Sequence, residues 1–167
     1  MSLGVVALDE SHDVESFTSG NIELDGWLRL HAPNATGQGT RTFVVIDEGD
    51  AVVGYFAIAP HVLDRDDAPT KLGRGAPRQI PAILLAKLAL SAELHGQGFG
   101  AELLVRALAT IIDAARAAGG KVVVVDAIDE SAAAFYRHHD FEPLPDRDDR
   151  LVMKLSTAAR ALGVAWP

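Results

Sequence analysis

The stretch Leu84–Ala118, LLAKLALSAELHGQGFGAELLVRALATIIDAARAA, decides the fold of this chain. An apolar run typical of a strand meets a turn with glycine at three alternating positions, and a helix with strong apolar periodicity follows. The turn spans His95 to Gly100. Glycine lets a ligand approach backbone N–H groups, and the helix N-terminus adds a positive dipole. The stretch therefore predicts an anion-binding site.

Length and composition indicate one globular domain over residues 1–167. The chain is 49% hydrophobic and 23% charged, as in ordinary globular proteins. It contains no cysteine, which excludes disulfides, thiolate metal ligands and a cysteine nucleophile, and we expect no metal cofactor. Lys87 interrupts the longest apolar run, so no membrane span is expected. The first residues carry no basic stretch typical of a signal peptide, which favours a cytoplasmic location.

Charge is unevenly distributed along the chain. The net charge of −8 argues against a surface that binds nucleic acid throughout. No acidic residue lies between Asp67 and Glu93, whereas this segment holds Lys71, Arg74, Arg78 and Lys87. The segment is interpreted either as a solvated loop or as a local basic face.

The remaining segments predict an α/β fold around this centre. Strands are expected at residues 5–8, 41–46, 51–58, 122–125 and 151–155, and helices at 21–32, 130–138 and 156–162. Pro33 is expected to end the first helix, and Asp129 or Ser131 to cap the second. Residues 60–80 are expected to form a long loop, and the charged run 146–150 to be solvated. The strand, helix and strand from residue 84 to 125 predict a right-handed parallel crossover.

Two motifs resemble those of the GCN5-related N-acetyltransferases. The run Leu88–Leu104, LALSAELHGQGFGAELL, is similar to the acetyl-CoA motif of that family, which reads Gln or Arg, two residues, Gly, one residue, then Gly or Ala. His95 occupies the Gln or Arg position, while Gly98 and Gly100 match. The helix with Phe135-Tyr136, followed by Asp140-Phe141, resembles the second signature, although the family usually has glycine at the position of Asp140. Aspartate tolerates the left-handed conformation better than most residues.

Further positions resemble one branch of the family, the acetyltransferase toxins of bacterial toxin–antitoxin pairs, which acetylate the amino acid on charged tRNA. The matching residues are Phe17-x-x-Gly20, Leu24-Asp25-x-Trp27-Leu28, Asn34, Arg41–Val44, Val53-Gly54-Tyr55 and Ile80-Pro81. The resemblance implies a central mixed, mostly antiparallel twisted sheet with one parallel crossover and flanking helices. It also implies acetyl-CoA as cofactor, aminoacyl-tRNA as substrate, a small ribbon-helix-helix antitoxin and a homodimer.

The resemblance assigns candidate cofactor and catalytic residues. Tyr136 is the candidate general acid, because a phenol with a pKa of about 10 can protonate the departing CoA thiolate; on its position alone, a core tyrosine is the alternative. The backbone of Leu88, Ala89 and Leu90 is expected to pair with the pantetheine arm as an added strand would. The other expected cofactor residues, with the pyrophosphate on the N–H groups from Gly96 to Ala101, are His95, Gly96, Gln97, Gly98, Phe99, Gly100, Ala101 and Phe135.

The substrate assignment begins with the attacking amine, which must be neutral. A lysine amine with a pKa of about 10.4 would need a base, whereas an α-amine near 8 has a usable neutral fraction. The lack of an obvious histidine–carboxylate pair is thus compatible with a charged-tRNA substrate, while Glu93, acting through water, stays open beside a role as a solvated acid. The residues expected to contact tRNA phosphates are Lys71, Arg74 and Arg78, with Lys87 and Arg41 as weaker candidates.

Two other functions remain open from the sequence. One is an N-acetyltransferase of the same fold that acts on a small-molecule or protein amine. The other is a non-catalytic module that binds CoA or a partner, for which the Tyr136 hydroxyl would be dispensable.

Overall fold

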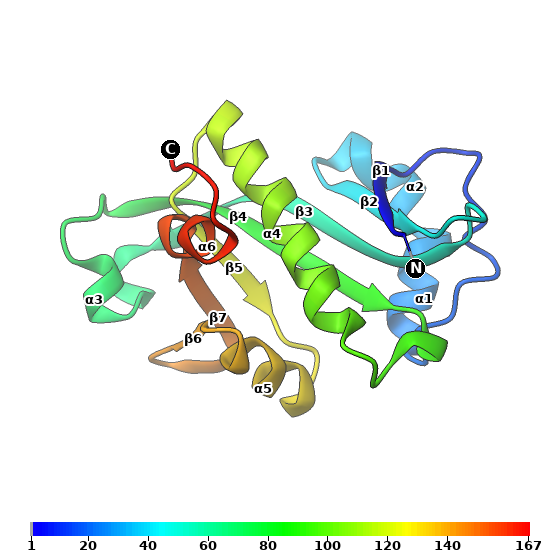
Figure 1. Cartoon of the computed structure of the whole chain (residues 1–167). Coiled ribbons are helices and arrows are strands. Elements are labelled where there is room, and N and C mark those ends of the chain that lie inside the picture. The colour runs from blue at the N-terminus through cyan, green and yellow to red at the C-terminus, as the bar shows by residue number, and fades with distance from the viewer. Residues whose placement is uncertain (1) are drawn as a thin grey trace. The chain divides into compact units, whose positions relative to one another are not determined.

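The computed structural model describes residues 2–167 (Figure 1). Its strands are β1 (Gly4–Ala7), β2 (Arg41–Ile46), β3 (Val52–Asp64), β4 (Gln79–Leu90), β5 (Val122–Asp126), β6 (Glu142–Leu144) and β7 (Arg147–Lys154). Its α-helices are α1 (Ile22–Leu30), α2 (Ala32–Ala35), α3 (Thr70–Gly73), α4 (Phe99–Ala118), α5 (Glu130–His138) and α6 (Leu155–Leu162). Among residues 2–167, no helix has the length and apolar character needed to cross a membrane.

The strands form one sheet in the order β1-β2-β3-β4-β5-β7-β6. Strands β4 and β5 are parallel, from Ala82↔Val122 to Leu85↔Val125, and helix α4 connects them in the chain. The pairs β1–β2, β2–β3, β5–β7 and β6–β7 are antiparallel. The expected mixed, mostly antiparallel sheet with one parallel crossover is therefore confirmed.

The chain divides into two compact units, each described here by itself. Unit 1 comprises the residues up to Ala59 together with Ala86–Ala107, and unit 2 comprises Pro60–Leu85 together with Leu108–Pro167. In unit 1, helix α1 buries Leu24 and Leu28 in a core that also contains Phe17, Tyr55 and Ala89. The Tyr55 side chain is fully buried, and its hydroxyl donates a hydrogen bond to the carbonyl oxygen of Leu24 at 2.7 Å.

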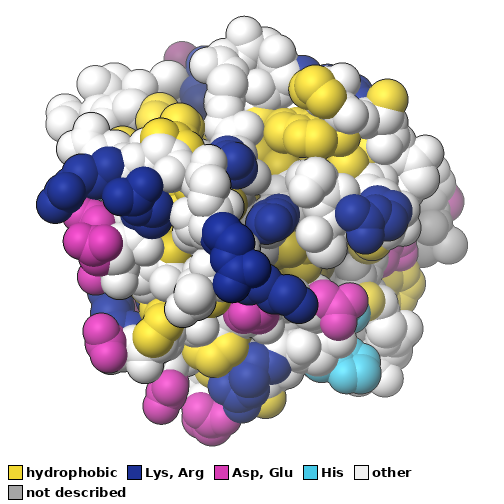
Figure 2. All heavy atoms as spheres, turned by 90° about the vertical axis from the view of Figure 1, so that its left-hand side faces the viewer, with side chains coloured by type: hydrophobic (Ala, Val, Ile, Leu, Met, Phe, Trp, Pro, Cys, Tyr) yellow, Lys and Arg dark blue, Asp and Glu magenta, His cyan; other side chains and the backbone are white. Residues whose placement is uncertain are grey.

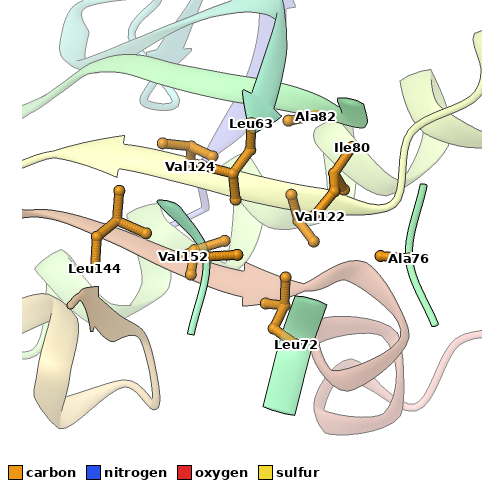
Figure 3. Close-up of a cluster of buried hydrophobic side chains, with 10 residues drawn as sticks. Leu63, Leu72, Ala76, Ile80, Ala82, Val122, Val124, Leu144 and Val152 are labelled. Atoms are coloured by element: carbon orange, nitrogen blue, oxygen red, sulfur yellow. The ribbon is translucent and has the colours of Figure 1, made fainter. Parts of the chain in front are cut away.

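The core of unit 2 is built on β5. All four valines of Val122–Val125 are fully buried, as expected for a parallel strand covered on both faces. Val122 and Val124 pack with Val152 of β7 and with Leu72 of α3 (Figure 3). Backbone hydrogen bonds join the segments beside this core. The Lys121 N–H donates to the carbonyl oxygen of Pro81 at 2.8 Å, and the Leu155 N–H donates to the carbonyl oxygen of Lys121 at 3.0 Å.

Residues 60–80 are the first place where the sequence-based expectation is wrong. Strand β3 continues to Asp64, helix α3 spans Thr70–Gly73, and β4 already begins at Gln79. The physical reason is that Leu63, Leu72, Ala76 and Ile80 bury apolar side chains against the sheet. The segment is therefore a folded cover of the core and not a long loop.

The helix and strand ends differ from expectation in three further places. Helix α1 ends at Leu30, and Pro33 lies in the first turn of α2. Proline is tolerated there because an N–H in the first turn has no acceptor within the helix. Strand β7 begins at Arg147 and so includes most of the charged run 146–150; residues 146–149 are exposed as expected, whereas Arg150 is half-buried. Helix α6 begins at Leu155, one residue before the expected start, and Lys154 is its N-cap.

Candidate active site

The glycine turn of unit 1 has the geometry of an anion-binding loop. Gly96 and Gly98 have φ angles of +76° and +84°, a region that side chains other than glycine rarely adopt. Both are exposed, and no atom lies within 4 Å of the position that a Cβ would take at either residue. Helix α4 begins at Phe99, so the first N–H groups of the helix have no acceptor within it. The turn thus offers several backbone donors to a phosphate group.

Side chains tie this turn to the end of β4. His95 Nε2 lies 2.9 Å from the carbonyl oxygen of Leu90 and donates to it in the tautomer protonated on Nε2. Gln97 Nε2 donates to the carbonyl oxygen of Glu93 at 2.9 Å. These side chains hold the turn in shape, and their contribution to cofactor binding stays a prediction. The exposed carboxylate of Glu93 has no hydrogen-bond partner among residues 2–167, and its role as a base stays a prediction.

Residues 88–90, the segment expected to pair with pantetheine, are held in place by backbone contacts within unit 1. Ser91 N–H donates to the carbonyl oxygen of Val53 at 2.8 Å. A Cβ on Gly54 would lie 3.2 Å from the carbonyl oxygen of Ala89 and 3.5 Å from Leu103 of α4. Gly54 therefore lets β3, β4 and α4 approach one another where Leu88–Leu90 is expected to bind the cofactor. Strand β4 pairs with β5 from Ala82 to Leu85 and itself continues to Leu90.

Tyr136 in unit 2 is a buried, protonated phenol. Only 7% of the residue is exposed, and its ring packs edge-on against Phe135 and Phe141, each with a centroid separation of 5.4 Å. Burial raises the pKa of Tyr136 above its ordinary value of 10. The hydroxyl therefore keeps its proton at neutral pH, as a general acid must. Phe135 is half-buried and also packs against His139.

The helix that carries Tyr136 is fixed at both ends. Asp129 caps α5 by accepting a hydrogen bond from the N–H of Ala132 at 2.8 Å, which confirms one of the two expected caps. Asp140, just beyond the helix, has a φ of +71°, so it adopts the left-handed conformation expected of the residue at this position. Phe141 N–H donates to the carbonyl oxygen of Tyr136 at 3.1 Å. Backbone strain is therefore accepted at the end of this helix.

The five cations proposed to contact substrate do not all belong to one unit. Lys71, Arg74 and Arg78 are exposed in unit 2, whereas Arg41 and Lys87 belong to unit 1. No carboxylate of residues 2–167 forms an ion pair with any of the five. Figure 2 views the side on which α3 lies and shows Lys and Arg side chains across the face, with acidic side chains mostly along its left and lower edges.

Sequence reasoning missed one further cation beside α3. Lys154 and Lys71 line the same hollow of about 180 Å³, together with Thr157, Asp140 and Glu142. Lys154 belongs to β7 and Lys71 to α3. No local pattern in the sequence connects two residues that are brought together only by the packing of α3 on the sheet.

A second missed feature is a polar cluster in unit 2. The Arg150 guanidinium donates to both carboxylate oxygens of Asp126, at 2.7 and 2.8 Å, and its Nη1 lies 3.1 Å from Nε2 of His61. Burial and the nearby charge of Arg150 lower the pKa of His61. The sequence interpretation placed Arg150 in a solvated run, but its side chain is only 19% exposed. The structure brings no group of three or more metal-ligating side chains together among residues 2–167.

Comparison with known proteins agrees with this geometry. The acetyltransferase (GNAT) domain family matches residues 38–143. The chain is 38% identical over 156 residues to the tRNA-acetylating toxin of Mycobacterium tuberculosis, and the match covers 93% of each protein.

Two solved structures share the fold. The structure of AtaT complexed with acetyl-methionyl-tRNAfMet gives a TM-score of 0.85 at 24% identity, over 96% of this chain and 99% of the other. A mutant of the AtaT toxin bound to the C-terminus of the antitoxin AtaR and acetyl-CoA gives 0.80 at 24% identity, over 96% and 98%. With the family match over the glycine turn and the Tyr136 helix, these findings show that the chain belongs to the GNAT acetyltransferase family and is homologous to the tRNA-acetylating toxins.

Proposed function

We propose that this protein is a toxin that transfers the acetyl group of acetyl-CoA to the α-amine of aminoacyl-tRNA and so blocks translation. The observation that carries the proposal is the similarity to a tRNA-acetylating toxin, at 38% identity over 93% of the chain. An acetylated α-amine is no longer a nucleophile, so the modified aminoacyl-tRNA is unable to accept a growing peptide.

The residues of unit 1 fit the cofactor. The N–H groups from Gly96 to Ala101, in a turn where Gly96 and Gly98 are exposed and have positive φ, suit a pyrophosphate. The backbone of Leu88–Leu90 lies beyond Leu85, where the pairing of β4 with β5 ends. This position suits a pantetheine arm that pairs with β4 as an added strand would. When bound, acetyl-CoA supplies an acetyl thioester.

The chemistry asked of the protein is a single proton transfer. The neutral amine forms a C–N bond to the acetyl carbon, and the C–S bond to CoA breaks. Tyr136 gives the proton of its hydroxyl to the departing sulfur, and its buried, un-ionised state supports that role. The proton lost from the amine goes to solvent, and the Tyr136 phenolate regains a proton from solvent. An α-amine with a pKa near 8 is sufficiently neutral to attack without a protein base.

Mass spectrometry of charged tRNA tests the proposal. Purified protein is incubated with acetyl-CoA and bulk aminoacylated tRNA, which is then digested and searched for acetyl-aminoacyl-adenosine. An adduct is expected on at least one amino acid. Acetylation of free amines alone would support the small-molecule or protein acetyltransferase instead. Binding of CoA without turnover on any amine would support a non-catalytic module.

The proposal also covers the antitoxin partner, the oligomeric state and the cellular location of the protein. An AtaT structure with the C-terminus of an antitoxin supports an antitoxin partner, and we propose that it is a small protein of the ribbon-helix-helix class. The active form is a homodimer located in the cytoplasm, where charged tRNA occurs. Co-expression with a small neighbouring reading frame, followed by sedimentation of the free toxin and of the complex, tests the partner and the dimer together.

A further inference from the structure

Lys87 in unit 1 is held against an aromatic stack. Its Nζ lies 5.7 Å from the centroid of the Trp27 ring, within the range of a cation–π contact. Trp27 is stacked on Tyr55, with a centroid separation of 6.0 Å and an interplanar angle of 7°, and Phe17 packs edge-on against Tyr55 at 5.8 Å. Because the Tyr55 hydroxyl is bonded to Leu24 in the core, the surface under the ammonium is rigid.

Lys87 is a half-buried residue whose ammonium has no counter-ion among residues 2–167. Half-buried arginines elsewhere in the molecule differ, since Arg106 pairs with Glu102 at 3.2 Å and Arg150 with Asp126 at 2.7 Å. A partly desolvated cation without a carboxylate partner is stabilised by any anion that reaches it. Lys87 is therefore the cation of unit 1 best prepared to bind an anionic ligand.

The position of Lys87 on β4 indicates which part of a ligand it meets. Alternate residues of a strand share a face, and Ala89 packs into the core beneath α1 with Leu24 and Tyr55, so Lys87 lies on the α1 face of the strand. With the pyrophosphate of the proposed cofactor at Gly96–Ala101, a pantetheine arm paired with Leu88–Leu90 would run toward lower residue numbers. Three residues of a strand span roughly 10 Å. The acetyl end of the arm would therefore lie near the level of Lys87.

From these observations we infer that Lys87, positioned by Trp27, binds the phosphodiester that precedes the terminal adenosine of the charged tRNA. The inference rests on the proposed function. This phosphate is the anion nearest to the aminoacyl ester, so a cation beside the acetyl end would hold the reacting amine in place. Trp27 is a positioning residue that acts through Lys87. Lys71, Arg74 and Arg78, exposed in unit 2, would contact phosphates of the tRNA body instead.

Two short substrates separate these roles. The amino acid found acetylated by mass spectrometry is esterified either to the trinucleotide CCA, which contains the phosphodiester, or to adenosine, which lacks it. For the wild type, kcat/KM is expected to be at least about tenfold higher with the trinucleotide, as for a hydrogen bond to a charged group. Lys87→Met should abolish this preference, because its kcat/KM on the trinucleotide substrate should fall by about tenfold. Lys87→Arg should keep the preference.

Variants of Trp27 and a direct binding measurement complete the test. Trp27→Phe retains an aromatic face and should keep most of the preference, whereas Trp27→Leu should lose part of it. Affinity for uncharged CCA, measured by calorimetry, should fall about tenfold in Lys87→Met. Equal preference and equal CCA affinity in wild type and Lys87→Met would overturn the inference. A wild type that acetylates no charged tRNA would overturn the proposed function instead, and the CCA affinity would then still decide whether Lys87 binds the phosphate.

Discussion

Arg150 grips both carboxylate oxygens of Asp126, with Nε to Oδ1 at 2.7 Å and Nη2 to Oδ2 at 2.8 Å, across the register of β5 and β7. Such a fork is stronger than a single exposed ion pair. Arg150→Met should therefore lower the free energy of unfolding by about 1–2 kcal/mol, because Asp126 and His61 lose their donor. Urea denaturation measures the loss. Arg147→Met is the matched control, since its pair with Asp149 is exposed and should contribute less than about 1 kcal/mol; equal losses would contradict the prediction.

His61 should make stability depend on pH. Burial and the charge of Arg150 lower its pKa in the folded protein below the ordinary 6.5, so the unfolded chain takes up this proton more readily. The contribution of His61 is then complete above pH 6.5 and is lost as pH falls through the lowered pKa. The free energy of unfolding, measured in urea between about pH 5 and 8, should fall on the acid side.

His61→Gln tests this assignment. It should make the pH dependence shallower, because the imidazole whose pKa is lowered is removed. Burial also lowers the pKa of His139, so part of the dependence should persist in His61→Gln. An unchanged curve in His61→Gln would show that the Arg150 contact does not govern this proton.

Tyr136→Phe should reduce kcat without unfolding the protein. Loss of a general acid costs about 100-fold or more, while the ring stays packed against Phe135 and Phe141, so the free energy of unfolding should change by less than about 1 kcal/mol. Affinity for CoA should be kept. Because burial raises the pKa of Tyr136 above 10, the wild-type kcat should show no alkaline fall from this group up to about pH 9. A fully active phenylalanine variant would exclude the phenol as the acid.

Gly98→Ala should weaken acetyl-CoA binding through the backbone. The φ of +84° costs a residue with a Cβ about 1 kcal/mol or more, and relief of that strain would rotate the N–H groups away from the pyrophosphate. Calorimetry should show an affinity at least about tenfold lower. Gly37→Ala is the control, because Gly37 has open space and no positive φ. Wild-type affinity in Gly98→Ala would mean that the turn is not the anion site.

The basic segment of unit 2 should determine how salt affects activity. Replacing Lys71, Arg74 and Arg78 by Gln should raise KM for charged tRNA and make log(kcat/KM) less steep against log[KCl] by roughly two to three. The same change of charge at Arg116, Arg147 and Arg160 is the control; the first two already pair with acids. Equal salt slopes in the two triple variants would show that net charge, and not this segment, attracts the tRNA.

Much of the fold could be predicted because local patterns determine it. The buried valines of β5, the periodic helix α4 and the Asp129 cap of α5 each follow from short-range rules. The failures have a common physical origin. Segment 60–80 is rich in Pro, Gly and charge, yet sparse apolar residues such as Leu63 and Leu72 bury themselves in a core that exists only after the sheet has formed. The polar composition of residues 60–80 therefore led to the prediction of a loop where the structure has a folded segment.

The part of the candidate site that is formed by backbone groups, the glycine turn, could be predicted from the sequence. The sequence shows the alternating glycines of the turn, and the structure adds that Gly96 and Gly98 adopt positive φ. The cluster of His61, Asp126 and Arg150 could not be predicted, because its members come from β3, β5 and β7 and meet only once the sheet has formed. The same holds for Lys87 and Trp27, whose contact depends on how α1 packs on β4.

Asp140 has a consequence for how this protein can evolve. Its φ of +71° costs an aspartate about 1 kcal/mol that a glycine would not pay. Codons for aspartate and glycine differ by a single base, so a gain in stability lies one point mutation away and leaves the phenol of Tyr136 untouched. A substitution of Asp140 by glycine at the end of α5 could therefore compensate for a destabilising mutation elsewhere in the chain without changing the acetyltransferase chemistry.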